Sequence, residues 1–399
     1  KHKLGIYASA QHIDRDSYYG GGEDIEEKLK SYGNTTDLTW MAGAQYNYKF
    51  DHCLFMPASL TVGSEYNQDI LDDNLWGRER FIKQNVRTVS GFIQNEWNNE
   101  IWSFLLGGRI DKHSLLKNPV FSPRANIRFN PTKNINLRAS YSFGFRAPQA
   151  FDEDLHVENV GGTVSMIQLA DNLKEEKSQS FSVSADVYHN WGNWQGNFLI
   201  EGFYTDISDV FALTEIGTDQ NGIIIIERGN EKGAYVYGCT LEGKIAWKNI
   251  WQFQTGLTLQ KAEYKEARSW SENDPNVPME KKMFRTPDLY GYFTTTYNPV
   301  RALSLSLSGT YTGSMLVEHH KGDIAVNRTE KTKSFIDLGF KAGYDFKLYK
   351  SITLQAYAGV QNIFNSYQND FDKGPDRDSG YIYGPSMPRS IYAGIKLSY

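Results

Sequence analysis

Side-chain alternation is the feature of this sequence that most restricts its fold. At the end of the chain, Ile391, Ala393, Ile395, Leu397 and Tyr399 alternate with polar or small residues. An apolar residue at every second position gives an extended strand one apolar and one polar face. The pattern recurs in roughly sixteen segments, most of them longer than the ~9–11 residues that a tilted strand needs to cross a bilayer. The sequence therefore predicts an all-β protein with about 16 strands.

The composition indicates what surrounds these strands. Aromatic residues make up 14% of the chain, yet only 40% of residues are hydrophobic and the mean hydropathy is −0.53. This combination is typical of a transmembrane antiparallel β-barrel, in which lipid covers one face, water fills the lumen and aromatic girdles mark both interfaces. No apolar run approaches the ~18 residues of a transmembrane helix. The net charge of −5 gives no basic surface for nucleic acid.

The connections between the strands are strongly asymmetric. Short turns, such as 97–100, 130–133 and 349–351, alternate with long loops. The long loops are expected at about 14–37, 69–80, 145–176, 213–232, 267–284, 317–332 and 363–388. Outer-membrane barrels have short periplasmic turns and long extracellular loops. We therefore expect an outer-membrane protein of a Gram-negative bacterium, with lipid around it, a binding surface outside and Tyr399 at the periplasmic side.

Motifs in the second part of the chain carry a family resemblance. In order along the sequence they are 143–148 (FGFRAP), 172–178 (NLKEEKS), 359–365 (GVQNIFN) and 384–389 (GPSMPR), followed by the closing strand. From about residue 140 to the end, they resemble the barrel of TonB-dependent outer-membrane receptors. The sequence departs from the family pattern at one point, because Leu173 stands after Asn172 where the family has Pro.

The resemblance implies an architecture larger than this chain. Receptors of this kind have about 22 strands around a plugged lumen. Residues 1–399 would then be the C-terminal portion of the β-barrel domain, with the N-terminal plug and the first strands, about six of them, outside this chain. The implied function is active transport: extracellular loops bind a bulky, scarce nutrient, and the TonB–ExbB–ExbD complex supplies energy for its import through the plug.

Ferric siderophore, cobalamin and haem are the cargoes that the resemblance implies, so that the cargo would carry iron or cobalt. A surface lipoprotein is a further expected partner, and no intrinsic cofactor is expected. Sixteen strands that begin and end in the periplasm would also suit a passive porin. A glycan-importing relative and an adhesin without cargo are further alternatives. No Ser/His/Asp, paired-carboxylate or phosphate-loop arrangement is apparent, which predicts that the protein is not an enzyme.

Four basic residues are candidates for ligand contact. Arg146 shares strand parity with Ser140, which places it in the lumen, where it would contact an anionic ligand or the plug, or else pin the following loop. His156 lies between two of the family motifs, as a histidine does in haem-importing members, and imidazole is a good iron ligand. His319 and His320 stand side by side in a predicted outer loop and would suit a metal chelate.

Aromatic and acidic loop residues complete the candidate set. Large, rigid rings capture bulky ligands with little loss of entropy. The loop aromatics are Tyr18, Tyr19, Trp76, Trp270, Tyr367, Tyr381 and Tyr383. Clustered carboxylates beside glycine suit Ca²⁺, although a solvated acidic loop is the alternative. The four carboxylates of this kind are Asp370, Asp372, Asp376 and Asp378.

Overall fold

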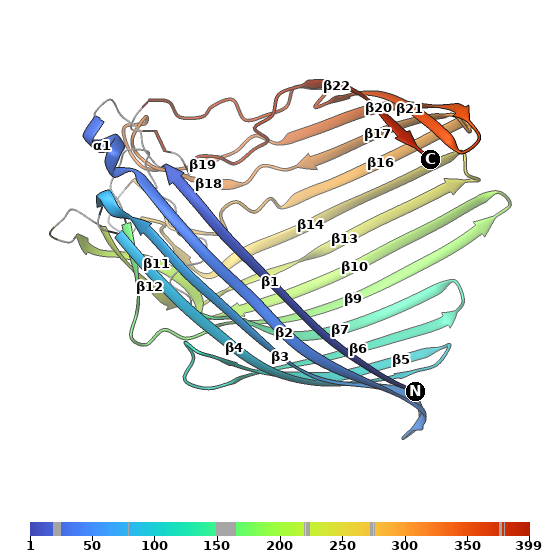
Figure 1. Cartoon of the computed structure of the whole chain (residues 1–399), viewed down its shortest axis with the longest axis horizontal. Helices are drawn as coiled ribbons and strands as arrows, with labels where there is room; N and C mark the ends of the chain where they lie inside the picture. The colour runs from blue at the N-terminus through green and yellow to red at the C-terminus, as the bar shows by residue number, and fades with distance from the viewer. Residues whose placement is uncertain are drawn as a thin grey trace.

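A computed structural model describes the chain except residues 19–24, 79, 149–164, 219, 221–223, 272–273, 275, 375–376 and 379. One 17-stranded antiparallel sheet dominates the structure (Figure 1). Sixteen of its strands pair with their neighbours in chain order, and the seventeenth, β15 (Glu280–Lys282), lies beside β14. The sixteen are β1 (His2–Tyr18), β2 (Tyr32–Cys53), β3 (Met56–Leu75), β4 (Arg80–Asn98), β5 (Trp102–His113), β6 (Val120–Thr132), β7 (Ile135–Arg146), β9 (Glu176–Trp191), β10 (Trp194–Ser208), β13 (Ala234–Trp247), β14 (Trp251–Arg268), β16 (Leu289–Val300), β17 (Leu303–Thr312), β20 (Phe335–Tyr349), β21 (Ile352–Gln361) and β22 (Ser390–Ser398). The predicted all-β fold is confirmed.

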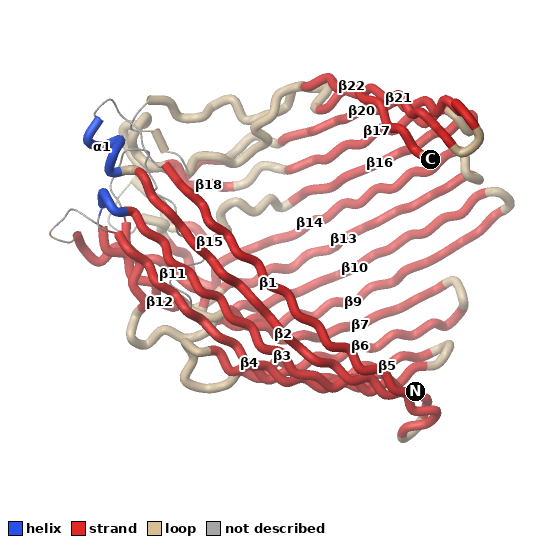
Figure 2. Tube along the Cα trace, viewed as in Figure 1, coloured by secondary structure: helices blue, strands red, loops and turns tan. Residues whose placement is uncertain are grey.

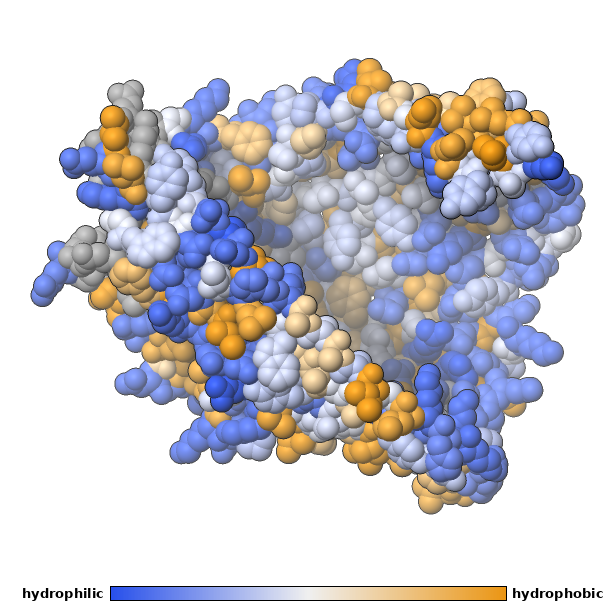
Figure 3. Space-filling model, in the orientation of Figure 1, coloured by the Kyte–Doolittle hydropathy of each residue, from blue (hydrophilic) through white to orange (hydrophobic). Residues whose placement is uncertain are grey.

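The pairing register keeps the two faces of the sheet distinct. Trp194 lies opposite both Trp191 and Trp247, so aromatic side chains form a row on the outer face near the short turns. Such a row is typical of an interfacial girdle. On the same face, Ile6 and Ile391 are 79% and 81% exposed, as expected of residues that contact lipid. Figure 3 shows the inner, concave face, where hydrophilic and intermediate residues predominate.

Short and long connections lie at opposite ends of the sheet, as the sequence predicts. Figure 2 shows the short turns at one end, together with both chain termini, and the longer connections and short helices at the other. We refer to these as the turn end and the loop end. In the outer-membrane orientation, the turn end faces the periplasm.

Two predicted loops are much shorter than expected. Instead of loops over 14–37 and 69–80, β1 pairs with β2 as far as Tyr18 and Tyr32, and β2 pairs with β3 as far as Asn34 and Asn74. The short helices α1 (Ile25–Lys30) and η1 (Trp76–Arg78) lie beyond them. A strand of 22 residues such as β2 spans roughly 70 Å at ~3.3 Å per residue, far more than the ~30 Å hydrocarbon core. Outside the membrane both strand faces meet water, so the apolar alternation that reveals a strand is lost.

Other long connections contain strands of their own. The three-stranded sheet of β8 (Ser165–Leu169), β11 (Val210–Thr218) and β12 (Ile224–Glu231) lies at the loop end. So does the hairpin of β18 (Leu316–His319) and β19 (Arg328–Lys331). Among the described residues, no helix is long and apolar enough to cross a membrane.

The sheet is open along two edges. Within the described part of the chain, β1 pairs only with β2 and β22 pairs only with β21. The sixteen strands therefore do not form the closed barrel that the porin alternative requires, and each edge presents unpaired backbone groups. Unpaired backbone groups are energetically costly in lipid, so each edge is expected to pair with a further strand.

Candidate ligand-binding site

A cavity of about 480 Å³ opens at the loop end of the sheet. We call it the outer pocket. The end of β12, the two residues between β12 and β13, and the end of β14 provide most of its lining. The lining residues are Asn230, Glu231, Lys232, Gly233, Tyr264, Glu266, Ala267, Arg268, Ser269 and Met279. A cavity of this size suits a small-molecule ligand.

Arg268 is the central cation of the outer pocket. Its guanidinium carbon lies 4.4 Å from the centroid of the Tyr264 ring, and Nη1 donates a hydrogen bond of 3.0 Å to Glu231 Oε2. The Nε atom of Arg268 has no hydrogen-bond partner among the described residues. A delocalised cation stacked on an aromatic ring suits an anionic or aromatic ligand.

Further side chains line the outer pocket around Arg268. Lys232 and Glu266 form an exposed ion pair at the rim, and Met279 adds an apolar side chain that is 63% exposed. Our sequence interpretation missed this pocket. The available signal was the spacing of Tyr264 and Arg268, which share one strand face directly before a long loop.

Arg146 contributes to the anchoring of the outer three-stranded sheet. It lies opposite Glu176 at the end of β7, on the same face as Ser140. Its guanidinium carbon is 5.3 Å from the centroid of the Phe211 ring, and that of Arg228 is 5.6 Å from the same ring. Arg146 thus contacts the outer sheet through β11; its pinning of the loop that follows β7 and its contact with a ligand both stay predictions.

Several candidate residues meet in a packed cluster that we call the loop core. It consists of Met315, Val317, His319, Tyr381 and Tyr383. The His319 ring stacks on the Tyr381 ring at 3.6 Å and 9°, and His319 Nε2 lies 2.9 Å from Asp372 Oδ1. His319 is 3% exposed and Tyr381 is 6% exposed. Both were expected on an outward-facing loop, but apolar and stacking contacts bury them instead.

The acidic cluster bonds to its own loop and to the neighbouring segment of His319 and His320. Asp372 Oδ2 accepts the backbone N–H of Asp378 at 3.0 Å, and Asp378 accepts those of His320 and Gly380 at 2.9 and 2.8 Å. Asp370 accepts the hydroxyl of Tyr383. Among the described residues, no group of three or more His, Cys, Asp or Glu could hold a metal ion. Asp376 lies outside the described residues, and the Ca²⁺ site stays a prediction.

Burial and carboxylate neighbours perturb the two tyrosines of the loop core. They raise the pKa of Tyr381 to about 12, with Asp370 as the main charged neighbour. The pKa of Tyr383 is raised further, by burial and by its hydrogen bond to Asp370. Both phenols therefore remain neutral donors over the physiological range.

The remaining aromatic candidates occupy different positions. Trp270 donates to Thr329 Oγ1 at 3.2 Å and meets the His320 ring edge-on at 4.6 Å, which ties two outer loops together. Tyr18 and Trp76 lie at the tips of the long hairpins and are 46% and 56% exposed. Tyr367 is half-buried. Two further candidates, Tyr19 and His156, lie outside the described residues.

The fold and the outer pocket together define a class, an outer-membrane barrel wall whose long connections build a ligand-sized site. A family model described as "TonB dependent receptor-like, beta-barrel" matches residues 2–363. The chain belongs to this family of transport receptors. This confirms the resemblance that the sequence motifs carry and extends it over the first strands.

Solved structures show the same fold at low sequence identity. The siderophore receptor PirA from Acinetobacter baumannii matches with a TM-score of 0.69 and 19% identity, over 100% of this chain and 60% of that one. A mutant of the ferric enterobactin receptor PfeA from Pseudomonas aeruginosa gives 0.70 and 17%, over 99% and 59%. The FrpB iron transporter from Neisseria meningitidis gives 0.68 and 14%, over 98% and 60%. The chain thus spans about 60% of their length. No curated protein sequence matches.

Proposed function

We propose that this chain forms the ligand-capturing wall of a receptor that imports a ferric siderophore across the outer membrane. The observation that carries the proposal is the outer pocket, with Arg268 stacked on Tyr264, at the loop end of a TonB-dependent receptor barrel. Iron chelates of this kind are bulky, and many are anionic and aromatic, which suits a stacked guanidinium. The similar structures include two siderophore or enterobactin receptors and an iron transporter, which supports this cargo over cobalamin or haem.

The mechanism follows from the energetics of scarce nutrients. A dilute ligand must be bound tightly, and a tightly bound ligand leaves only when work is done on the complex. We infer that a plug domain and about six further strands complete the barrel along the open edges of β1 and β22. The TonB–ExbB–ExbD complex would act on the plug from the inner membrane. The protein thus transports a ligand and catalyses no reaction.

Iron uptake in a deletion strain tests the proposal. Cells that express the full-length receptor should accumulate ⁵⁵Fe from ferric enterobactin, and dissipation of the proton gradient should abolish the accumulation while surface binding persists. The same cells should be tested with cyanocobalamin and haemin. Uptake of haemin or cyanocobalamin without uptake of ferric enterobactin, uptake of none of the three, or uptake that does not depend on the proton gradient would contradict the proposal.

A further inference from the structure

A group of basic and polar side chains lies on the outer, lipid-facing side of β3, β4 and β5. We call it the interface patch, and it consists of Gln68, Asn85, Arg87 and Lys112. In the strand register, Arg87 lies opposite Gln68, and Lys112 lies opposite Val89, two residues along β4. Arg87 and Lys112 are both exposed, and Val89 is 55% exposed. The two cations therefore adjoin a surface that contacts lipid.

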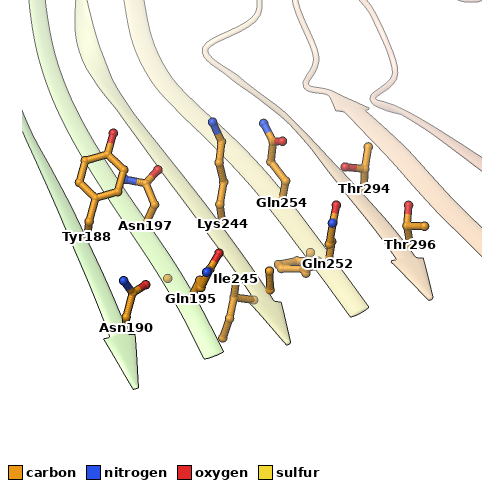
Figure 4. A pocket seen from close by; sticks show the side chains of 13 residues that line it. Tyr188, Asn190, Gln195, Asn197, Lys244, Ile245, Gln252, Gln254, Thr294 and Thr296 are labelled. Carbon is orange, nitrogen blue, oxygen red and sulfur yellow. The ribbon is translucent and has the colours of Figure 1, made fainter. Parts of the chain in front are cut away.

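Neither the plug nor the further strands inferred above would cover the interface patch. Figure 4 shows side chains of the concave face, such as Lys244 and Gln254, which line the lumen and which a plug would cover. The interface patch lies on the opposite face of the sheet. In addition, β1 and β2 separate it from the nearer open edge. Its exposure is therefore a property of the barrel wall itself.

The position of Arg87 along β4 matches the outer membrane interface. Trp97 belongs to the aromatic girdle at the turn end, where its ring stacks on that of Phe55 at 5.6 Å. Arg87 lies ten residues farther along the same strand, on the same face. At ~3.3 Å per residue and a tilt of ~35–45°, this distance corresponds to a rise of roughly 25 Å, the height of the apolar band of an outer-membrane barrel. Trp40 and Tyr66 on the neighbouring strands, with rings 4.9 Å apart, suit a second girdle there.

Hydrogen bonds within the protein orient both cations and leave donors for a ligand. Arg87 Nε donates to Asn85 Oδ1 at 3.4 Å, and Gln68 Nε2 donates to the same oxygen at 2.9 Å. The two terminal nitrogens of Arg87 make no hydrogen bond or ion pair within the described ranges. Lys112 Nζ donates to two carbonyls of the following loop at 2.6 and 2.9 Å, which leaves one of its three N–H groups.

No acidic side chain neutralises the patch. On the outer face of β3, β4 and β5, as far as the structure describes these strands, the one carboxylate is Asp72. Its Oδ2 lies 3.1 Å from Lys83 Nζ, so it is paired with a cation outside the patch. The interface patch therefore carries a net positive charge at the level of the lipid headgroups.

We propose that the interface patch binds the phosphate group of an anionic lipid in the outer leaflet of the membrane. The terminal nitrogens of Arg87 would donate two parallel hydrogen bonds to phosphate oxygens, and the remaining N–H of Lys112 would donate a third. The acyl chains would lie along Val89, Ile93 and Ile110, which are 50–55% exposed on the same face. A free phosphate lacks this apolar contact, so the surface favours a lipid.

Native mass spectrometry of the full-length receptor in detergent, titrated with diphosphoryl lipid A, tests the proposal. We expect saturable binding that is about tenfold weaker in Arg87→Gln and in Lys112→Gln, because each variant loses a charged donor. Arg138→Gln is the matched control. Like Arg87, Arg138 is exposed and donates from Nε to an asparagine two residues earlier, but it lies on the inner face. This variant should bind lipid A like the wild type.

Unchanged affinity in Arg87→Gln would overturn the inference. So would an equal loss in Arg138→Gln, which would show a general effect of net charge. Displacement of lipid A by inorganic phosphate in millimolar excess would assign the patch to a soluble anion and would also overturn it. Lipid binding in detergent requires neither cargo nor transport. Its failure is therefore distinguishable from a failure of the proposed function, which is tested by ⁵⁵Fe uptake.

Discussion

The first four strands and the last five main strands extend outward in different ways. Strands β1–β4 have 17, 22, 20 and 19 residues, so their backbone ladders continue far beyond the membrane. Strands β16, β17, β20, β21 and β22 have only 12, 10, 15, 10 and 9 residues. Above these shorter strands, irregular loops pack around the loop core. The first region, β1–β4, is held by main-chain pairing, and we call it the ladder region. The second, the loops above β16, β17, β20, β21 and β22, depends on particular side chains, and we call it the packed region.

Gln368 shows how a side chain can replace a strand partner. It is 1% exposed; its Nε2 donates to the carbonyl of Tyr381, and its Oε1 accepts the backbone N–H groups of Tyr383 and Gly384. Asn362 acts similarly and bonds to the backbone of Ser366 and Met387. These amides satisfy loop backbone groups that have no ladder. The packed region should therefore be sensitive to single substitutions, and the ladder region should tolerate them.

The largest effect is expected from His319→Ala. The change leaves Oδ1 of the buried Asp372 side chain without its partner, while Oδ2 keeps the backbone N–H of Asp378, and it opens a space beneath Tyr381. Removal of one member of a buried polar pair typically costs about 3 kcal/mol. Hydrogen exchange should rise in residues 363–374 and 314–320, while β2 and β3 stay protected. Unchanged protection of both loops would show that the loop core does not hold them.

Alkaline pH should loosen the same region by a smaller amount. Folding raises the pKa of Tyr381 to about 12, so the neutral phenol is favoured in the packed state. This contribution is fully present below pH ~10 and is lost as the pH rises toward 12. Tyrosinate absorbance should show late-titrating groups, one of which Tyr381→Phe removes while the Tyr383 phenol stays late-titrating. A titration of all tyrosines near pH 10 would contradict the burial.

The smallest effect is expected at the tip of the ladder region. Lys83 Nζ lies 3.1 Å from Asp72 Oδ2, and the two side chains are 76% and 36% exposed. Exposed ion pairs of this kind contribute little to stability. Lys83→Ala should leave hydrogen exchange in β3 and β4 unchanged within error. A clear loss of protection would show that side chains, as well as the ladder, hold this region.

The sequence predicted the membrane-crossing part of the fold well, because lipid on one face and water on the other impose the period of two. Its prediction was wrong where that contrast ends. Residues 14–18 and 69–75 continue their strands, although polar residues such as Asp14, Asp16, Asp72 and Asp73 occupy both faces. Only the partner strand identifies them, and partner strands cannot be read from local alternation.

The candidate site was less predictable, because it depends on contacts between distant loops. Residue type singled out His319, Tyr381 and Asp372 as separate candidates, yet sequence alone could not show that they pack on one another. Conversely, Arg268 was passed over. Its spacing from Tyr264 on β14 was a local signal, but its ion pair with Glu231 becomes visible only when β12 and β14 are placed together.

Ferric enterobactin binding by two matched variants of the full-length receptor tests the central claim, capture in the outer pocket, most directly. Arg268→Ala and Lys83→Ala each remove a cation that lies about 3 Å from a carboxylate, at 3.0 and 3.1 Å respectively. Loss of a charged donor that contacts the ligand costs about 2 kcal/mol, or roughly thirtyfold in affinity. We predict this loss for Arg268→Ala and no change for Lys83→Ala. Undiminished affinity in Arg268→Ala, or an equal loss in both variants, would contradict the claim.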